Sequence, residues 1–107
     1  MKVVYNSIIP FRGYKAISLF GIVFVRNGCF MTSRDLRHEE IHFRQQREML
    51  FVFFYLWYFV EWLIKLFKYN DFHEAYKNIS FEREAYCKEN VLNYLDIRDS
   101  FEWFNYL

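Results

Sequence analysis

The chain has 107 residues, enough for one domain, and 54% of them are hydrophobic. This apolar fraction excludes intrinsic disorder, which requires few aromatic residues and a large net charge. With 14 basic and 13 acidic residues the formal net charge is +1, so the composition offers no basic face for nucleic acid. Two cysteines, Cys29 and Cys87, exclude a disulfide-rich scaffold, and we expect both to be free thiols.

The first 32 residues are rich in β-prone residues and hold every glycine and the one proline of the chain. Short β-prone runs occupy positions 3–5, 16–20 and 22–25. The pair Asn27-Gly28 follows, and an Asn-Gly pair between apolar runs is typical of a type I′ hairpin turn. We therefore expect residues 29–31 to form a return strand and the segment to form a small antiparallel sheet of two to four strands.

The rest of the chain, from residue 29 onward, contains no glycine or proline, which favours helices. Thr32 and Ser33 are candidate N-caps for a helix that begins near Arg34. Nothing in the sequence ends this helix before residues 69–71. It therefore either exceeds 30 residues or bends without a cause that the sequence reveals.

Shorter elements are expected beyond this point. A short helix is predicted over residues 72–78, and Ser80 is a candidate cap for another helix over residues 81–95. Four aromatic residues lie in the last segment, residues 97–107. We expect this segment to be a tail that docks on the body of the domain.

Residues 38–42 read His-Glu-Glu-Ile-His, an H-E-x-x-H motif within the first expected helix. His38 and His42 are one helical turn apart and face the same way, so their imidazoles could bind one ion. From its position on the helix, Glu39 would reach a water on the metal rather than the metal itself. Zinc suits such a site because imidazole is a good ligand for it. The alternative is a pair of surface histidines on a charged helical turn.

A catalytic zinc takes three protein ligands, so a third must come from elsewhere in the chain. The candidates are His73, which is the remaining histidine, and Glu82 and Glu84 in a later helix. The glutamates also have a simpler explanation, because the helix dipole stabilises acidic residues near a helix N-terminus. The residue types alone leave the choice open.

The sequence His38-Glu39-x-x-His42, followed on a later helix by Glu82-x-x-Ala85, resembles the gluzincin metallopeptidases. It is similar to membrane proteases of the CAAX-prenyl-protease and heat-shock type, and by its length to the single-domain minigluzincins. The resemblance implies that His38, His42 and Glu82 bind zinc and that Glu39 is the general base. It also implies hydrolysis of a peptide bond, with Glu39 taking a proton from an activated water and passing it to the leaving amine.

The chain departs from this pattern at Tyr86, where the family often has an aspartate that supports a ligating histidine. Tyr86 is a candidate catalytic residue, because its hydroxyl could replace that support or stabilise an oxyanion; alternatively, it indicates a weakened activity. The resemblance favours Glu82 over Glu84. It further implies that a peptide substrate pairs with an edge strand, which residues 22–31 would offer. Gln45 shares the metal-facing side, as a substrate contact or as a plain surface glutamine.

Residues 49–67 form an apolar, aromatic run that only Glu61 and Lys65 interrupt. Its length is close to the roughly 20 residues that cross a bilayer. We expect either a core or homodimer helix, or membrane association through this segment. The mean hydropathy of −0.12 favours the former. The N-terminus lacks the uninterrupted apolar core of a signal peptide, so the expected location is cytoplasmic.

Together these patterns predict one α+β domain over residues 1–107, a minimal zincin-like unit with a small antiparallel hairpin sheet and about three helices. Its parts are a β-rich segment (1–32), the motif and apolar helices (33–68), the third-ligand helices (72–96) and the docking tail (97–107). The predicted function is a zinc-dependent peptidase acting on a peptide or protein. The alternative is a non-enzymatic interaction or membrane-associated protein whose metal site is degenerate or structural.

Overall fold

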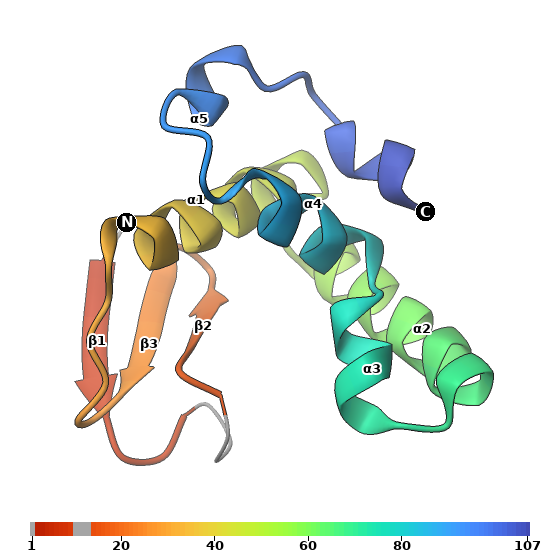
Figure 1. The fold of residues 1–107 in the computed structure, drawn as a ribbon, viewed down its shortest axis with the longest axis horizontal. Helices are drawn as coiled ribbons and strands as arrows, with labels where there is room; N and C mark the ends of the chain where they lie inside the picture. The colour runs from red at the N-terminus through yellow and green to blue at the C-terminus, as the bar shows by residue number, and fades with distance from the viewer. Residues whose placement is uncertain (1, 10–13) are drawn as a thin grey trace.

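The computed structural model describes residues 2–9 and 14–107, which form an α+β fold as the sequence predicts. Figure 1 shows the sheet at one side, the α2–α3 pair at the other, and α1 and α4 side by side between them. The elements, in chain order, are β1 (Lys2–Asn6), β2 (Ala16–Leu19), β3 (Ile22–Arg26), α1 (Ser33–Glu48), α2 (Val52–Tyr69), α3 (Phe72–Lys77), α4 (Ser80–Lys88), α5 (Tyr94–Ile97) and a 3₁₀ helix, η1 (Glu102–Tyr106).

The sheet is mixed, so the prediction of an antiparallel sheet is wrong. Its strand order is β1-β3-β2, with β3 antiparallel to β2 and parallel to β1. Because β1 occupies the second edge of β3, no return strand can pair there. The turn at Asn27-Gly28 does form, with Cys29 N–H donating to the Arg26 carbonyl at 3.1 Å. The chain then runs to α1, and residues 29–31 are not a strand.

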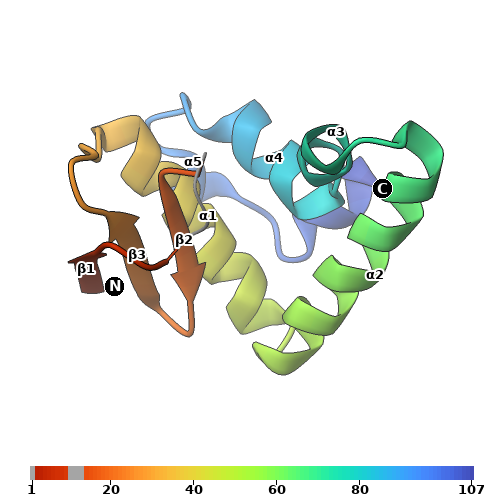
Figure 2. The same cartoon turned by 90° about the horizontal axis from the view of Figure 1, so that it is seen from below.

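The hairpin turn lies instead at Phe20-Gly21, between the paired residues Leu19 and Ile22. Both turn residues have positive φ, 51° for Phe20 and 83° for Gly21, the conformation that a tight two-residue hairpin requires. Phe20 is held there because its N–H donates to the Tyr55 hydroxyl at 2.9 Å. The strand predicted to offer a free edge, within residues 22–31, is therefore central. The edge strand that packs on α1 is β2 (Figure 2).

Helix α1 begins at the predicted place because Thr32 caps it. The Thr32 hydroxyl accepts from Asp35 N–H, and the Asp35 carboxylate accepts from Thr32 N–H, a reciprocal capping box. The long helix expected from the sequence does not continue without interruption: α1 ends at Glu48, and the chain bends before α2 begins at Val52. Leu50 and Phe51 have φ of 53° and 58°, and Phe51 N–H donates to the Gln46 carbonyl at 2.7 Å.

The bend lies at the start of the apolar run of residues 49–67 and separates this run from the helix that carries the motif. The axes of α1 and α2 are bent by 111°, so the two helices form the arms of a V (Figure 2). Within the part of the chain that the structure describes, no single helix is both long and apolar enough to cross a bilayer. α1 and α2 meet that length and composition only as this bent pair.

Two apolar clusters place α4 against its neighbours. Ile41 of α1 packs with Ala85 of α4 and Tyr94 of α5. Phe54 of α2 packs with Phe81 of α4; Ile79 and Trp103 complete that cluster. Trp103 belongs to the last segment, which thus lies against the body of the molecule. α4 ends at Lys88 rather than near residue 95, and its N-cap is Ile79 rather than Ser80.

Candidate metal centre

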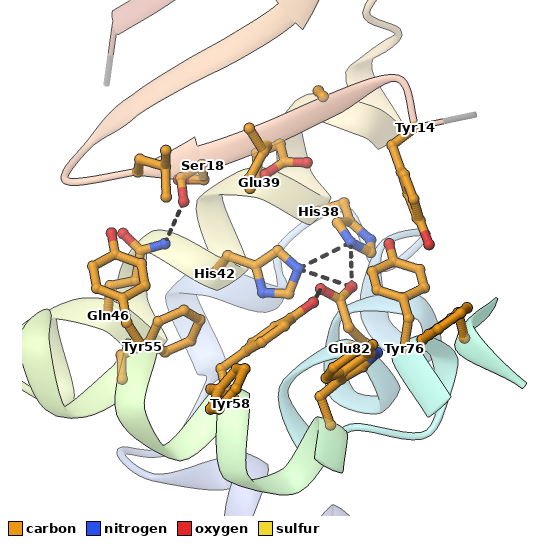
Figure 3. Close-up of a pocket in the computed structure, with 17 residues that line it drawn as sticks. Tyr14, Ser18, His38, Glu39, His42, Gln46, Tyr55, Tyr58, Tyr76 and Glu82 are labelled. Atoms are coloured by element: carbon orange, nitrogen blue, oxygen red, sulfur yellow. Dashed lines mark hydrogen bonds and ion pairs between the residues drawn. The ribbon is translucent and has the colours of Figure 1, made fainter. Parts of the chain in front are cut away.

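Three ligating atoms from two helices converge on one point of the structure (Figure 3). The Nε2 atoms of His38 and His42 on α1 are 3.1 Å apart. Oε1 of Glu82, on α4, lies 3.2 Å from His38 Nε2 and 3.1 Å from His42 Nε2. All three residues are buried. The structure thus brings together the three residues that the motif and the resemblance single out.

The orientation of each imidazole is fixed by a second hydrogen bond. His42 Nδ1 lies 2.8 Å from Gln45 Oε1, and His38 Nδ1 lies 2.7 Å from Glu89 Oε2. The amide of Gln45 cannot be turned over, because its nitrogen donates to the Phe81 carbonyl and to Glu84. Both partner oxygens only accept, so each Nδ1 carries the hydrogen and each Nε2 presents its lone pair to the convergence point.

The Glu82 carboxylate is oriented from the opposite side. The Tyr58 hydroxyl donates to Oε2 at 2.8 Å, which leaves Oε1 for the histidines. Burial first, and the nearby Glu82 carboxylate second, raise the pKa of Tyr58 well above its ordinary value. Tyr58 therefore remains a protonated donor at neutral pH.

The donor set fits a zinc ion. Three acceptor atoms face one another, so a proton or a cation must lie between them. Two atoms each about 2 Å from one tetrahedral zinc are roughly 3.3 Å apart, and the separations here are 3.1 to 3.2 Å. In the absence of a metal ion, a proton lies between the three acceptor atoms. Burial lowers the pKa of His42, but the Glu82 carboxylate, together with Glu39 and Gln45, outweighs burial and raises it to about 9. Burial alone would raise the pKa of Glu82, but His42 and His38 hold it below its ordinary value.

Glu39 lies beside this cluster and faces β2 (Figure 3). Its side chain is buried, and its Oε2 atom has no hydrogen-bond partner within residues 2–9 and 14–107. Burial raises the pKa of Glu39, although the charges of His42 and His38 partly offset this. A buried carboxylate with an unpartnered oxygen next to a ligand cluster is suited to accept a proton from a water molecule.

The cluster and Glu39 lie in the wall of a pocket of about 570 Å³. Its other walls come from β2, from α2 and from Tyr14, Phe72 and Tyr76, and most of them are apolar. Tyr14 and Tyr76 lie on one side of the cluster, and Gln46 and Tyr55 on the other (Figure 3). The pocket thus gives an apolar ligand access to the point where the three ligating atoms meet.

The structure places Tyr86 against His38 through its ring, with 4.5 Å between the ring centroids. The hydroxyls of Tyr86 and Tyr76 are 2.8 Å apart, and it is Tyr76 that lines the pocket. The support for His38 comes from Glu89 rather than from Tyr86. A catalytic role for Tyr86 stays a prediction.

The other candidate ligands point elsewhere. Glu84 is fully buried on another side of α4, where it accepts from Tyr94 and Arg98. His73 is exposed, and its ring lies at a tilt beside the rings of Tyr76 and Tyr14. Gln45 is fully buried and supports His42, so it is neither a surface glutamine nor part of the pocket wall.

Sequence reasoning missed three residues of the site: Tyr58, Tyr76 and Glu89. Glu89 follows Glu82 by seven residues, a spacing that returns to the same helix face, so this signal was available. No comparable signal marks Tyr58 or Tyr76, because their positions depend on how α2 and α3 pack on α4.

Comparison with known proteins yields no relative. The chain matches no protein-family model, and neither a curated protein nor a solved structure is significantly similar to it. The likeness to the gluzincins therefore rests on the motif residues alone.

Proposed function

We propose that this chain is a zinc-dependent peptidase in which His38, His42 and Glu82 hold the metal and Glu39 is the general base. One observation carries the proposal: three buried ligating atoms lie within 4.8 Å of one another, with Glu39 beside them in the wall of an open pocket. When bound there, zinc would lower the pKa of a coordinated water toward about 7 and polarise a substrate carbonyl.

The remaining steps belong to the residues of the chain. Glu39 would accept the proton of the attacking water and deliver it to the leaving amine. Its raised pKa supports this role, because a base is most effective when its pKa approaches the working pH. Gln45 and Glu89 would hold the imidazoles in the tautomer that binds metal.

A peptide substrate would be positioned by β2. This strand is at the edge of the sheet and lines the pocket from Ala16 to Leu19. An extended peptide can add to such an edge through main-chain hydrogen bonds. Gln46 anchors the strand to α1, because its side-chain amide donates to the Ser18 carbonyl at 2.8 Å.

Metal analysis tests the ligand set. Purified wild-type protein should bind about one zinc per chain, and His38→Ala and Glu82→Gln should each lower the affinity for zinc at least about 100-fold. His73→Ala is the matched control, since it removes the third, exposed histidine and should bind zinc like the wild type. The proposal fails if the wild-type protein binds no zinc, or if His38→Ala binds it unchanged.

Glu39→Gln separates catalysis from metal binding. We expect the variant to retain zinc and to lose at least about 100-fold in kcat, measured on a casein digest or a library of quenched fluorescent peptides. Zinc binding with no hydrolysis by either protein would instead support a structural metal site in a non-enzymatic protein.

A further inference from the structure

Helix α2 has one buried face and one exposed apolar face. Its inner face carries Phe54, Tyr58 and Glu61 into the core and the metal centre. Its outer face, as we define it, consists of Val52, Phe53, Leu56, Phe59, Val60, Ile64 and Phe67, all of them exposed. At 100° per residue these seven positions fall within an arc of roughly 140°. The arc contains no charged residue, because the charged residues of α2 (Glu61, Lys65 and Lys68) lie outside it.

The size of this face is that of a protein interface. A large apolar side chain that is more than half exposed presents roughly 100 Å², so the seven together exceed the 300–600 Å² of the largest patch on a typical monomer. They approach the roughly 800 Å² per partner that a stable complex buries.

The shape of the face is complementary to itself. A groove of about 700 Å³ runs along one side of it, lined by Leu50, Phe53, Leu56, Val60 and Ile64 among others. On the other side of the arc the exposed side chains of Val52 and Phe59 form a ridge. A twofold axis through the face would set the ridge of each copy into the groove of the other, which is how an isologous interface closes.

The charges around the groove are compatible with a second copy of the chain as the partner. The two acids that line the groove already have partners, Glu48 in an ion pair with Arg98 and Glu61 in a hydrogen bond with Ser80 N–H. Two copies could therefore meet without burying an unpaired charge. A flat bilayer would leave the groove unfilled, whereas a second copy can fill it.

We propose that the outer face of α2 binds a second copy of this chain and forms a symmetric homodimer. This inference does not depend on the metal centre, since none of the seven residues is a candidate ligand, although Phe59 also lines the pocket beside that centre. It accounts for an apolar helix face that residues 2–9 and 14–107 leave exposed.

Sedimentation velocity and light scattering between about 1 and 100 μM test the proposal. Wild-type protein should have about twice the 13.4 kDa mass of one chain. Leu56→Glu, at the centre of the face, should be monomeric over the whole range. Leu92→Glu is the matched control, because Leu92 is 85% exposed and lies outside the face. This variant should remain dimeric.

Phe67→Ser keeps the test decisive if Leu56→Glu does not fold. Phe67 is 89% exposed, so its truncation removes little from the monomer but should raise the dimer Kd at least tenfold. A monomeric wild type at 100 μM would overturn the proposal, as would a folded Leu56→Glu that stays dimeric. So would a monomer that pellets with vesicles of phosphatidylcholine and phosphatidylglycerol, because lipid would then be the occupant.

Discussion

At the scale of single residues, the candidate metal centre depends on the atoms that point away from the place where the three ligating atoms meet. The ligand positions follow from helix geometry, but the direction of each lone pair is set by Gln45, Glu89 and Tyr58. Tyr58 has the clearest part, because its hydroxyl bonds one oxygen of Glu82 and leaves the other for the histidines. Such supporting bonds orient ligands and raise their affinity for metal.

Tyr58→Phe should therefore weaken zinc binding while leaving the fold intact. Removing the hydroxyl leaves a buried carboxylate oxygen without its donor, which costs about 1–3 kcal/mol. We expect the Kd for zinc to rise about tenfold in a competition titration with a chromophoric chelator. Tyr55→Phe is the control, since Tyr55 lines the same pocket but bonds Phe20 N–H. Equal affinities for the two variants would contradict the role of Tyr58.

The candidate ligand residues could be identified from the sequence, whereas most of the residues that support them could not. His38 and His42 share a face on any regular helix, so their spacing suffices. Glu82 could be chosen only through the resemblance to the gluzincins, because residue spacing does not show which helix packs on α1. Tyr58 is 24 residues from the carboxylate that it bonds, and its role appears only when α2 is placed in space.

At the scale of elements, α4 is held by a cap that another helix supplies. Its N-cap residue, Ile79, has no side-chain cap. The carboxylate of Glu61, on α2, instead accepts from Ser80 N–H at 2.9 Å, from the Ser80 hydroxyl, and from Trp57 Nε1 at 2.7 Å. Because Ser80 precedes Glu82 by two residues, this contact also fixes where the third ligand lies.

Glu61→Ala should lower both stability and zinc affinity. Loss of a helix cap costs about 1 kcal/mol, and leaving a buried N–H unsatisfied costs about 1–3 kcal/mol. We expect a loss of roughly 2–3 kcal/mol in the free energy of unfolding by urea. Glu61→Gln should recover part of it, because the amide oxygen can still accept from Ser80 N–H. Glu40→Ala, an exposed glutamate on α1, serves as the control. A loss below about 0.5 kcal/mol for Glu61→Ala would exclude the capping role.

The elements themselves were predictable to different degrees. The start of α1 followed from Thr32, because a capping box is a local interaction. The bend at residues 49–51 did not, because no glycine or proline marks it. Leu50 and Phe51 adopt positive φ only because tertiary contacts hold them there; Phe51 stacks on Phe20 at 5.7 Å. The mixed sheet escaped prediction for the same reason, since the strand that pairs with β3 comes from the far end of the β-rich segment.

At the scale of the whole molecule, many polar residues are buried while many aromatic residues are exposed. Among residues 2–9 and 14–107, ten polar or charged residues are buried, most of them in or near the candidate metal centre. Several aromatic residues of the run at 49–67 are instead exposed on the surface, among them Phe53, Phe59 and Phe67. The sequence offered a core, dimer or membrane helix as alternatives, but α2 divides its residues between the core, the pocket wall and an exposed face. The pH dependence of the whole domain should then be dominated by the buried centre.

Metal-free and zinc-bound protein should respond to pH in opposite directions. His42 has a pKa of 6.5 when unfolded and about 9 when folded, so the stability it contributes is complete below pH 6.5 and is lost as the pH rises through 9. The pKa of Glu82 is lowered on folding, so its contribution is present above pH 4.5 and is lost in acid. Zinc requires unprotonated imidazoles, so its affinity rises with pH over the range in which the metal-free protein weakens.

Thermal unfolding in zinc and in a chelator, between pH 5.5 and 9, measures both trends. In the chelator we expect Tm to fall by at least about 4 °C from pH 6.5 to 9, the shift that roughly 1 kcal/mol gives a domain of this size. The stabilisation by zinc should grow over the same range. His73→Ala should keep both trends, and His42→Gln should lose both, because only His42 belongs to the centre. A chelated wild type whose Tm stays level or rises across this range would show that no proton occupies the place where the three ligating atoms meet.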